Sequence, residues 1–229
     1  MGEMGFLSVQ DAARKLGLSE QRVRVLVASH RIPAAKVGGR WLLPASALQE
    51  RSVLDRFPGR PLSPANAWAY LWLLSGRNPE WLDPSQRSHL KYRRYVDPEE
   101  LIARVRSRCR VESYWVHSGM LSKLRDDLRL VLSGVSAARK YSIDLLAEQE
   151  VEGYVRASEL EALIDDVKAI DGERPNCLLR IVEEESWPFD NEERVAPALV
   201  AAIDLMESSN PRARRAGAAL ISSLLGGSV

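Results

Sequence analysis

The sequence contains few cysteines and few histidines. Among its 229 residues, two are cysteine (Cys109 and Cys177) and three are histidine (His30, His89 and His117). Two cysteines are too few for a disulfide scaffold or a cysteine zinc site, so we expect buried thiols in a reducing compartment. The histidines lie far apart, without metal-ligand neighbours three to five residues on. We therefore predict a protein without a metal site.

Long apolar runs and the motifs of common enzyme classes are also missing. No run of eighteen apolar residues occurs, and the N-terminus lacks the order of a signal peptide, so we expect a cytoplasmic protein without membrane contact. The Walker loop, the dinucleotide-binding glycine pattern and G-x-S-x-G are absent. Neighbouring acidic residues such as Asp165 and Asp166 point about 100° apart in a helix and are expected to be solvated. We predict no enzyme, no catalytic residues and no cofactor.

Positive and negative residues nearly balance over the whole chain, but they are distributed unevenly along it. The net charge is +1, with 45% hydrophobic and 28% charged residues, as in an ordinary globular protein. Residues 1–57 hold nine Lys/Arg against five Asp/Glu, residues 58–142 fifteen against eight, and residues 143–229 eight against eighteen. A basic front and an acidic back favour two surfaces for two different partners, and the basic part favours a polyanion.

Residues 6–28 carry the pattern of two short helices joined by a tight turn. Ser8 suits the N-cap of the first helix, which has apolar residues at helical spacing from Val9 to Leu16. Gly17 is expected to end that helix, because glycine accepts the left-handed backbone of a C-cap. Ser19 is expected to cap the second helix.

The second predicted helix has one apolar side and one polar side. Its apolar residues repeat at i, i+3 and i+4 and must face inward: Val23, Leu26 and Val27. This leaves Gln21, Arg22 and Arg24 on the outer face near the helix start. In a helix-turn-helix, this part of the second helix enters the major groove, where Arg and Gln make bidentate contacts to base edges.

A small hairpin is predicted after these helices. Two extended runs, 34–37 and 40–43, flank the two-residue turn signal Gly38-Gly39. Lys36 and Arg40 near the tip suit contacts to backbone phosphates. Pro44 is expected to stop the second strand, and a third helix is expected through Leu48.

The segments LSVQDAARKLGLSEQRV and IPAAKVGGRWLLPASAL resemble the excisionase/MerR-type winged helix-turn-helix over residues 6–50. This resemblance implies a DNA-binding domain. The predicted DNA-binding residues are Ser19, Gln21, Arg22, Arg24, Arg31, Lys36, Gly39 and Arg40. The alternative is a small helical subdomain that packs on a protein partner, because the apolar spacing is the same in both cases.

The rest of the chain is predicted to be helical first and α/β later. After a linker over 51–63, a helix from Pro64 to Gly76 is rich in aromatic residues, which suits either a core or a partner surface. A basic and aromatic stretch follows over 84–95, and the outer face of the next helix is expected to carry Arg104, Arg106 and Arg108. From residue 111 strands and helices alternate, with two helices at the end.

We therefore predict a mainly α fold with small β elements in three parts. These are a winged helix-turn-helix domain over residues 1–56, a helical basic and aromatic segment over 57–110, and an α/β domain over 111–229.

A second resemblance covers about 170 residues from Arg60. The segments RPLSPANAWAYLWLLSG, EVEGYVRASELEALI and VAAIDLMESSNPRARRAGAALI are similar to the C-terminal region of AbiEi-type antitoxins of actinobacterial toxin–antitoxin operons. This resemblance implies an antitoxin that represses its own operon and opposes a nucleotidyltransferase-like toxin. The excisionase-type module here departs from that family's usual winged-helix domain.

The function predicted from these patterns is a repressor that binds double-stranded operator DNA, as a dimer on DNA, and has a cognate toxin as its second partner. One alternative is a protein-interaction module without DNA binding. Another is an RNA- or single-strand-binding protein that uses the basic residues from Arg87 to Arg110.

Overall fold

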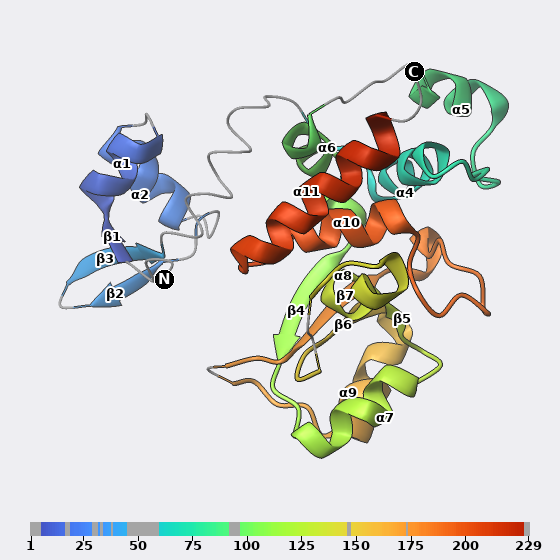
Figure 1. Ribbon diagram of the computed structural model, residues 1–229. Helices are drawn as coiled ribbons and strands as arrows, with labels where there is room; N and C mark the ends of the chain where they lie inside the picture. Colours follow the sequence, from blue (N-terminus) through green and yellow to red (C-terminus); the bar gives the residue numbers. More distant parts are fainter. Residues whose placement is uncertain are drawn as a thin grey trace. The chain divides into compact units, whose positions relative to one another are not determined.

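The structure is a computed structural model (Figure 1). It describes residues 6–16, 19–28, 32, 34–37, 39–44, 60–91, 97–145, 148–172 and 174–226. Within these ranges, the side chains of nine residues fall outside the description: Lys15, Leu16, Arg22, Val25, Leu26, Ala28, Ala35, Val37 and Arg40. The chain divides into two compact units, residues 1–59 and 60–229. The described part is mainly α-helical with small β-sheets, as predicted.

The first unit combines a helix pair with a small antiparallel sheet. Strand β1 (Phe6–Ser8) leads into α1 (Val9–Leu16) and α2 (Glu20–Ala28), and β2 (Ala35–Val37) and β3 (Arg40–Pro44) form the hairpin. The sheet order is β1-β3-β2, with both pairings antiparallel. The buried apolar residues of helices, connections and sheet form one core: Ala12, Ala13, Val23, Val27, Ile32 and Leu43.

The helix pair and the hairpin confirm the predicted arrangement, and one strand was not predicted. β1 pairs with β3 from Phe6↔Pro44 to Ser8↔Leu42, so the strand β3 continues through Pro44, where it was expected to stop. Among the described residues, β2 pairs only with residues 40–42 of β3, so Pro44 has a neighbouring strand on one side alone, as a residue of an edge strand does. Gly17 and the third helix expected through Leu48 lie outside the described residues.

The second unit begins with α4 (Pro64–Leu74), α5 (Pro84–Lys91) and α6 (Pro98–Val105). A proline at the first position starts each helix, since its missing N–H has no intrahelical partner there. Asp97 caps α6 by accepting a hydrogen bond from the Glu99 backbone N–H at 2.8 Å. The aromatic helix α4 lies in the core, because its largest side chains are buried: Trp68, Tyr70, Leu71 and Trp72.

A mixed sheet follows in the order β4-β7-β6-β5. The strands are β4 (Arg110–Tyr114), β5 (Val131–Leu132), β6 (Val151–Arg156) and β7 (Cys177–Val182). β6 and β7 are parallel, while the other two pairings are antiparallel. Strand and helix therefore alternate over residues 110–182, as predicted for a small α/β arrangement.

Helices cover the two faces of this sheet differently. One face packs against α7 (Leu121–Asp126) and α9 (Leu160–Val167), and apolar residues of β6 and β7 complete that core. On the other face lie α8 (Gly134–Ala137) and α10 (Ala198–Glu207), and Tyr154 of β6 joins α4 and α10 in the larger core (Figure 1). The sheet is thus held between two apolar layers.

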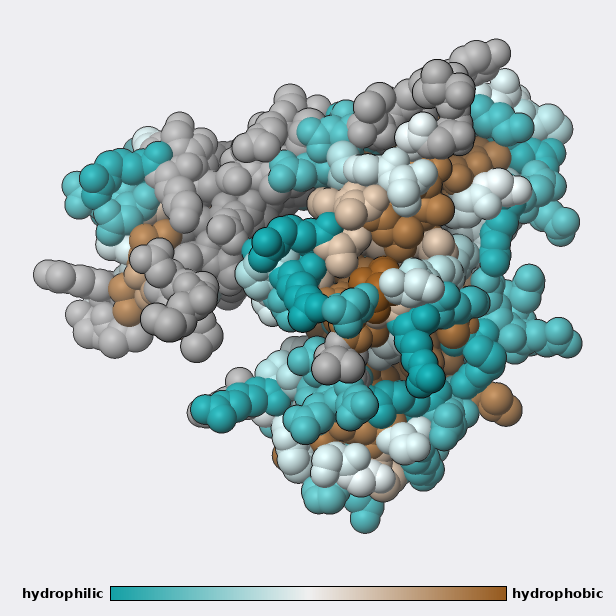
Figure 2. Space-filling view, in the orientation of Figure 1, coloured by the Kyte–Doolittle hydropathy of each residue, from teal (hydrophilic) through white to brown (hydrophobic). Residues whose placement is uncertain are grey.

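The final helix, α11 (Pro211–Gly226), packs closely along α10. A Cβ on Gly217 would lie 2.5 Å from the Ala202 carbonyl oxygen, so glycine is needed for this approach. Hydrophobic residues gather over α10 and α11 on the visible face of the second unit (Figure 2). Among the described residues, every helix is too short or too polar to cross a membrane.

The second unit departs from the predictions at two points. Helices α4 to α6 share a core with the sheet and α10, so the described part of the predicted segment 57–110 is built into the same unit as residues 111–226. Arg108 was expected on an outer helix face, and this prediction is wrong. Its side chain is 1% exposed and forms ion pairs with acidic residues of α10. Its partners lie far along the chain, where helical spacing carries no information about them.

Candidate nucleic-acid interface

α1 is fixed at its start by Ser8. The Ser8 hydroxyl accepts a hydrogen bond from the Asp11 backbone N–H at 3.1 Å and lies 2.7 Å from the Asp11 carboxylate. This bond to the carboxylate is the main reason why the pKa of Asp11 lies below its ordinary value. Arg14 pairs with the same carboxylate. The N-cap predicted from the sequence is therefore confirmed, and it sets the direction of the helix pair.

α2 presents the polar side chains expected of a recognition helix. It begins immediately after Ser19, and its buried residues Val23 (0% exposed) and Val27 (4%) anchor it to α1 and the sheet. Gln21 and Arg24 are exposed. Residues three apart share one helix face, so both side chains point outward from the same side, near the start of α2.

Arg24 has an acidic neighbour one turn earlier in α2. The Arg24 guanidinium lies 2.9 Å from the Glu20 carboxylate, and the two side chains are 60% and 44% exposed. Such an exposed pair contributes only about 0–1 kcal/mol. It holds Arg24 along the helix surface, and it opens at small cost when a stronger acceptor arrives.

The hairpin supplies a second basic position. Lys36 of β2 lies opposite Trp41 of β3, and its Nζ lies 5.9 Å from the Trp41 ring centroid. Lys36 is exposed, whereas Trp41 is half-buried beside the core. Gly39 has φ +79°, a left-handed backbone that glycine adopts without strain, which fits the predicted two-residue turn.

The predicted DNA-binding residues are described to different extents. Ser19, Gln21 and Arg24 lie on or beside the start of α2, and Lys36 and Gly39 lie on the hairpin. Arg22 lies in α2 and Arg40 in β3, but their side chains lie outside the described residues, as does the whole of Arg31. Figure 2 shows that hydrophilic residues also gather over α1.

Two neighbours of the predicted site were not singled out from the sequence. Glu20 pairs with Arg24, and the i, i+4 spacing of opposite charges was a readable signal for this pair. Trp41 supports Lys36 across the hairpin, which only the strand register reveals.

The cysteines and acidic residues of the second unit give a different picture. Burial raises the pKa of Cys109 to about 11 and that of Cys177 to about 12, so both thiols stay protonated at neutral pH. Both cysteines are free; the expected burial is confirmed for Cys177, whereas Cys109 is half-buried. In the described parts of the chain, no group of three or more His, Cys, Asp or Glu residues is arranged to hold a metal ion.

Residues 6–51 match the family model of a helix-turn-helix domain. This match spans β1, the helix pair and the hairpin. A search of curated proteins gives no match for the chain, and a search of solved structures gives none either. The described helix pair and hairpin agree with the family match, which identifies an excisionase-like helix-turn-helix domain, a type of domain that binds DNA.

Proposed function

We propose that this protein is a transcriptional repressor that reads double-stranded operator DNA with α2. The observation that supports this best is the pair of exposed side chains, Gln21 and Arg24, on one face at the start of α2. Gln pairs well with adenine and Arg with guanine in the major groove. In this proposal, Arg24 leaves Glu20 and turns to a base edge.

The hairpin serves as the second contact. Lys36 touches a backbone phosphate, which fixes the domain on the duplex without reading sequence. Two copies occupy half-sites about 34–36 Å apart, because one short recognition helix reads only a few base pairs.

Selection of bound duplexes from a random library, followed by mobility shifts with the selected site, tests this function. We expect a specific complex that unrelated duplex DNA does not displace at equal concentration. The Gln21→Ala variant is expected to weaken binding to the selected site by about 1–3 kcal/mol and leave binding to unrelated DNA unchanged. Gln10→Ala, an exposed glutamine on α1, serves as the matched control. Selection of no site would overturn the proposal and favour a protein-interaction module.

We further propose that the second unit gives the protein an antitoxin role without enzymatic activity. The support is the similarity of its three segments to AbiEi-type antitoxins. Co-expression with a nucleotidyltransferase-like toxin from a neighbouring gene tests this: the full chain is expected to restore growth. Continued growth arrest, with both proteins present in soluble form, would contradict the antitoxin role.

One observation argues against the alternative hypothesis of an RNA-binding protein. Arg108, one of the basic residues it requires, is buried and paired with acidic side chains. Competition with unrelated RNA during the mobility shift tests whether the other basic residues of this region bind RNA.

A further inference from the structure

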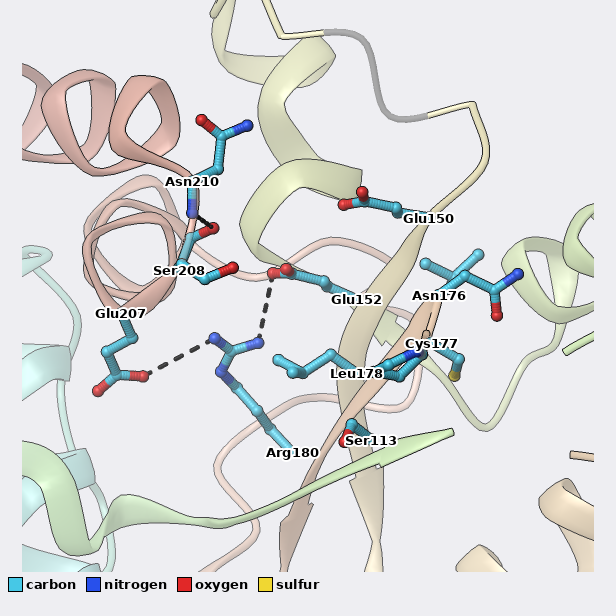
Figure 3. Close-up of a pocket in the computed structure, with 13 residues that line it drawn as sticks. Ser113, Glu150, Glu152, Asn176, Cys177, Leu178, Arg180, Glu207, Ser208 and Asn210 are labelled. Atoms are coloured by element: carbon cyan, nitrogen blue, oxygen red, sulfur yellow. Dashed lines mark hydrogen bonds and ion pairs between the residues drawn. The ribbon is translucent and has the colours of Figure 1, made fainter. Parts of the chain in front are cut away.

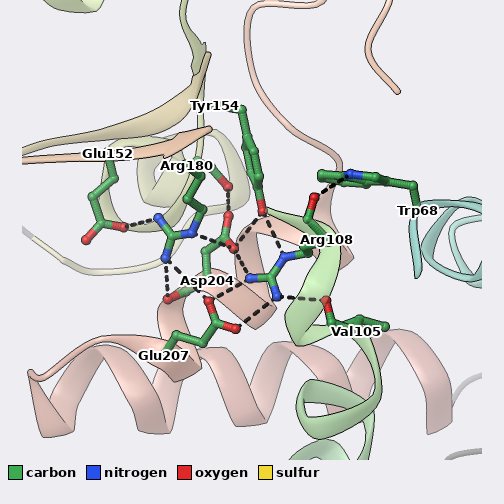
Figure 4. Close-up of polar contacts among 9 residues, drawn as sticks. Trp68, Val105, Arg108, Glu152, Tyr154, Arg180, Asp204 and Glu207 are labelled. Atoms are coloured by element: carbon green, nitrogen blue, oxygen red, sulfur yellow. Dashed lines mark hydrogen bonds and ion pairs between the residues drawn. The ribbon is translucent and has the colours of Figure 1, made fainter. Parts of the chain in front are cut away.

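A buried cluster of ionic side chains lies between the sheet and α10 (Figure 4). Arg108 donates to Asp204 at 2.7 Å and to the two Glu207 oxygens at 2.9 and 2.6 Å. Arg180 of β7 has its Nε 3.0 Å from the Asp204 carboxylate. Both guanidinium groups are almost fully buried, at 1% and 2% exposed.

Glu152 of β6 is the third carboxylate of this cluster, and it has the weakest partner. The nearest guanidinium nitrogen to Glu152, on Arg180, is 3.5 Å away. By contrast, each hydrogen bond from Arg108 to the carboxylates of Asp204 and Glu207 is shorter than 3.0 Å. The backbone N–H of Val135 also donates to Glu152. Two positive groups therefore face three carboxylates, and the unbalanced negative charge falls on Glu152.

Glu152 also lines a cavity of about 320 Å³ (Figure 3). The cavity lies over the sheet face beside the turn that joins α10 to α11, and it is lined by both charged and polar side chains. Glu152 and Arg180 come from the neighbouring strands β6 and β7, Glu150 lies just before β6, and Glu207 and Ser208 lie at the end of α10 (Figure 3). Leu178 adds apolar surface. Such a mixture suits a small organic group with a charged end.

A buried unbalanced carboxylate has two ways to become neutral. Burial raises the pKa of Glu152 to about 7, opposed by the nearby Arg180 charge, so a proton neutralises it in mildly acidic solution. Around it, the charged groups of the described residues are Arg180 on β7, Asp204 and Glu207 on α10, and Glu150 just before β6. The other way is a cation that enters the cavity.

We propose that this cavity binds the guanidinium or alkylammonium group of a ligand, with Glu152 and Glu150 as its carboxylate partners. The group can belong to a free small molecule or to an Arg or Lys side chain of a partner protein. A metal ion is the poorer occupant, because the acidic residues of the described chain are not arranged as a metal-binding group. The site lies wholly within the second unit, so it stands or falls independently of DNA binding.

Calorimetric titration of the full chain with n-propylguanidinium tests this site. Neutral n-propylurea has nearly the same shape and serves as the matched probe. We expect the cation to bind and the urea to bind at least tenfold more weakly. Equal binding of the two probes, no binding of either, or tighter binding of Mg²⁺ would each overturn the proposal.

The pH dependence of the wild-type protein gives a test that needs no variant. A cation that requires ionised Glu152 is expected to bind about tenfold more weakly at pH 6 than at pH 8, because a proton competes with it below a pKa near 7. Equal affinity at the two pH values, or tighter binding at pH 6, would contradict a role for Glu152.

Two variants separate Glu152 from other acidic residues. Glu152→Gln keeps an acceptor for the Val135 N–H and is expected to lose at least tenfold in affinity, together with the pH dependence. Glu184→Gln changes an exposed carboxylate that lies elsewhere, beside Arg156, and is expected to bind like wild type. Unchanged binding by a folded Glu152→Gln protein would overturn the site.

A last comparison distinguishes the two sources of the cation. A hexapeptide with one central arginine is titrated beside n-propylguanidinium. Tighter binding of the peptide supports a partner side chain, and exclusion of the peptide supports a free small molecule. Failure of both to bind would overturn the proposal.

Discussion

The Arg108 guanidinium lies 2.7 Å from the Asp204 carboxylate, and these side chains are 1% and 0% exposed. This pair joins the segment that follows α6 to α10. Trp68 of α4 approaches the same point, since its indole N–H donates to the Arg108 carbonyl oxygen at 3.0 Å. The contact thus ties α4, α10 and the start of β4 together.

Removal of Arg108 is expected to destabilise the second unit strongly. Arg108→Met leaves Asp204 and Glu207 without their closest positive charge, and such a loss costs about 3–5 kcal/mol in a buried pair. Urea denaturation of the full chain measures the change in the free energy of unfolding. Arg212→Met is the control, because its pair with Asp144 is 65% and 90% exposed, and it is expected to leave stability nearly unchanged. Equal effects of the two variants would contradict the structural role of Arg108.

Gly134 is expected to tolerate no side chain. Its φ is +52°, and a Cβ there would lie 1.7 Å from the Glu152 Oε2. Gly134→Ala is expected to cost about 1–3 kcal/mol through backbone strain, and to displace the Glu152 carboxylate as well. Gly76→Ala isolates the backbone effect, because Gly76 has φ +73° and open space around its Cα. A loss at Gly134 no larger than the loss at Gly76, measured by urea denaturation, would show that the Glu152 carboxylate is not held there.

Glu152 is expected to make stability fall as the pH rises. Its pKa is about 7 in the folded chain and near 4.5 in the unfolded chain, so between these values the unfolded chain releases a proton that the folded chain keeps. The loss is of the order of 3 kcal/mol between pH 4.5 and pH 7. Glu152→Gln removes it, so the variant is expected to match wild type near pH 4.5 and to exceed it in stability at pH 8. An equal difference at both pH values would contradict the raised pKa.

The features of the second unit that could be predicted from the sequence are those set by residues close together in the chain. Ser63, Pro64 and Gly76 bracket α4 as predicted, and the apolar run from Cys177 to Val182 is β7, because these signals lie within the elements themselves. Arg108 has the same local spacing as Arg104 and Arg106. Its partners Asp204 and Glu207 are 96 and 99 residues away, so its burial could not be read from local pattern.

The DNA interface was more accessible to sequence analysis. The outward position of Gln21 and Arg24 follows from the apolar residues on the opposite side of α2, a local and periodic signal. β1 was missed because three residues are too few for a visible alternation, and its pairing with β3 joins residues more than thirty positions apart.

Lys36 is expected to act on every DNA sequence alike. Lys36→Ala removes one phosphate contact, which should lower affinity uniformly and reduce the slope of log affinity against log salt by about 1. Mobility shifts at several salt concentrations, with selected and unrelated duplexes, measure both effects. Lys123→Ala, an exposed lysine on α7, is the control. A loss confined to the selected duplex would make Lys36 a base-reading residue.

Glu20 is expected to restrain DNA binding. Glu20→Gln frees Arg24 from an exposed i, i+4 pair and removes a negative charge near the phosphates, so affinity is expected to rise about twofold. Fluorescence anisotropy with a labelled duplex measures this change. Glu161→Gln on α9 provides an exposed carboxylate in the other unit for comparison. Weaker binding by Glu20→Gln would indicate that Glu20 itself accepts a hydrogen bond from a base.

The position of β7 in the sheet determines when the sheet can form during synthesis of the chain. β7 lies between β4 and β6, yet both neighbours leave the ribosome before it. Until β7 has been synthesised, β4 has no strand to pair with, and the backbone edge of β6 that pairs with β7 stays open. We therefore expect chains that contain β4 and β6 but end before residue 177 to be more prone to aggregation than the complete second unit.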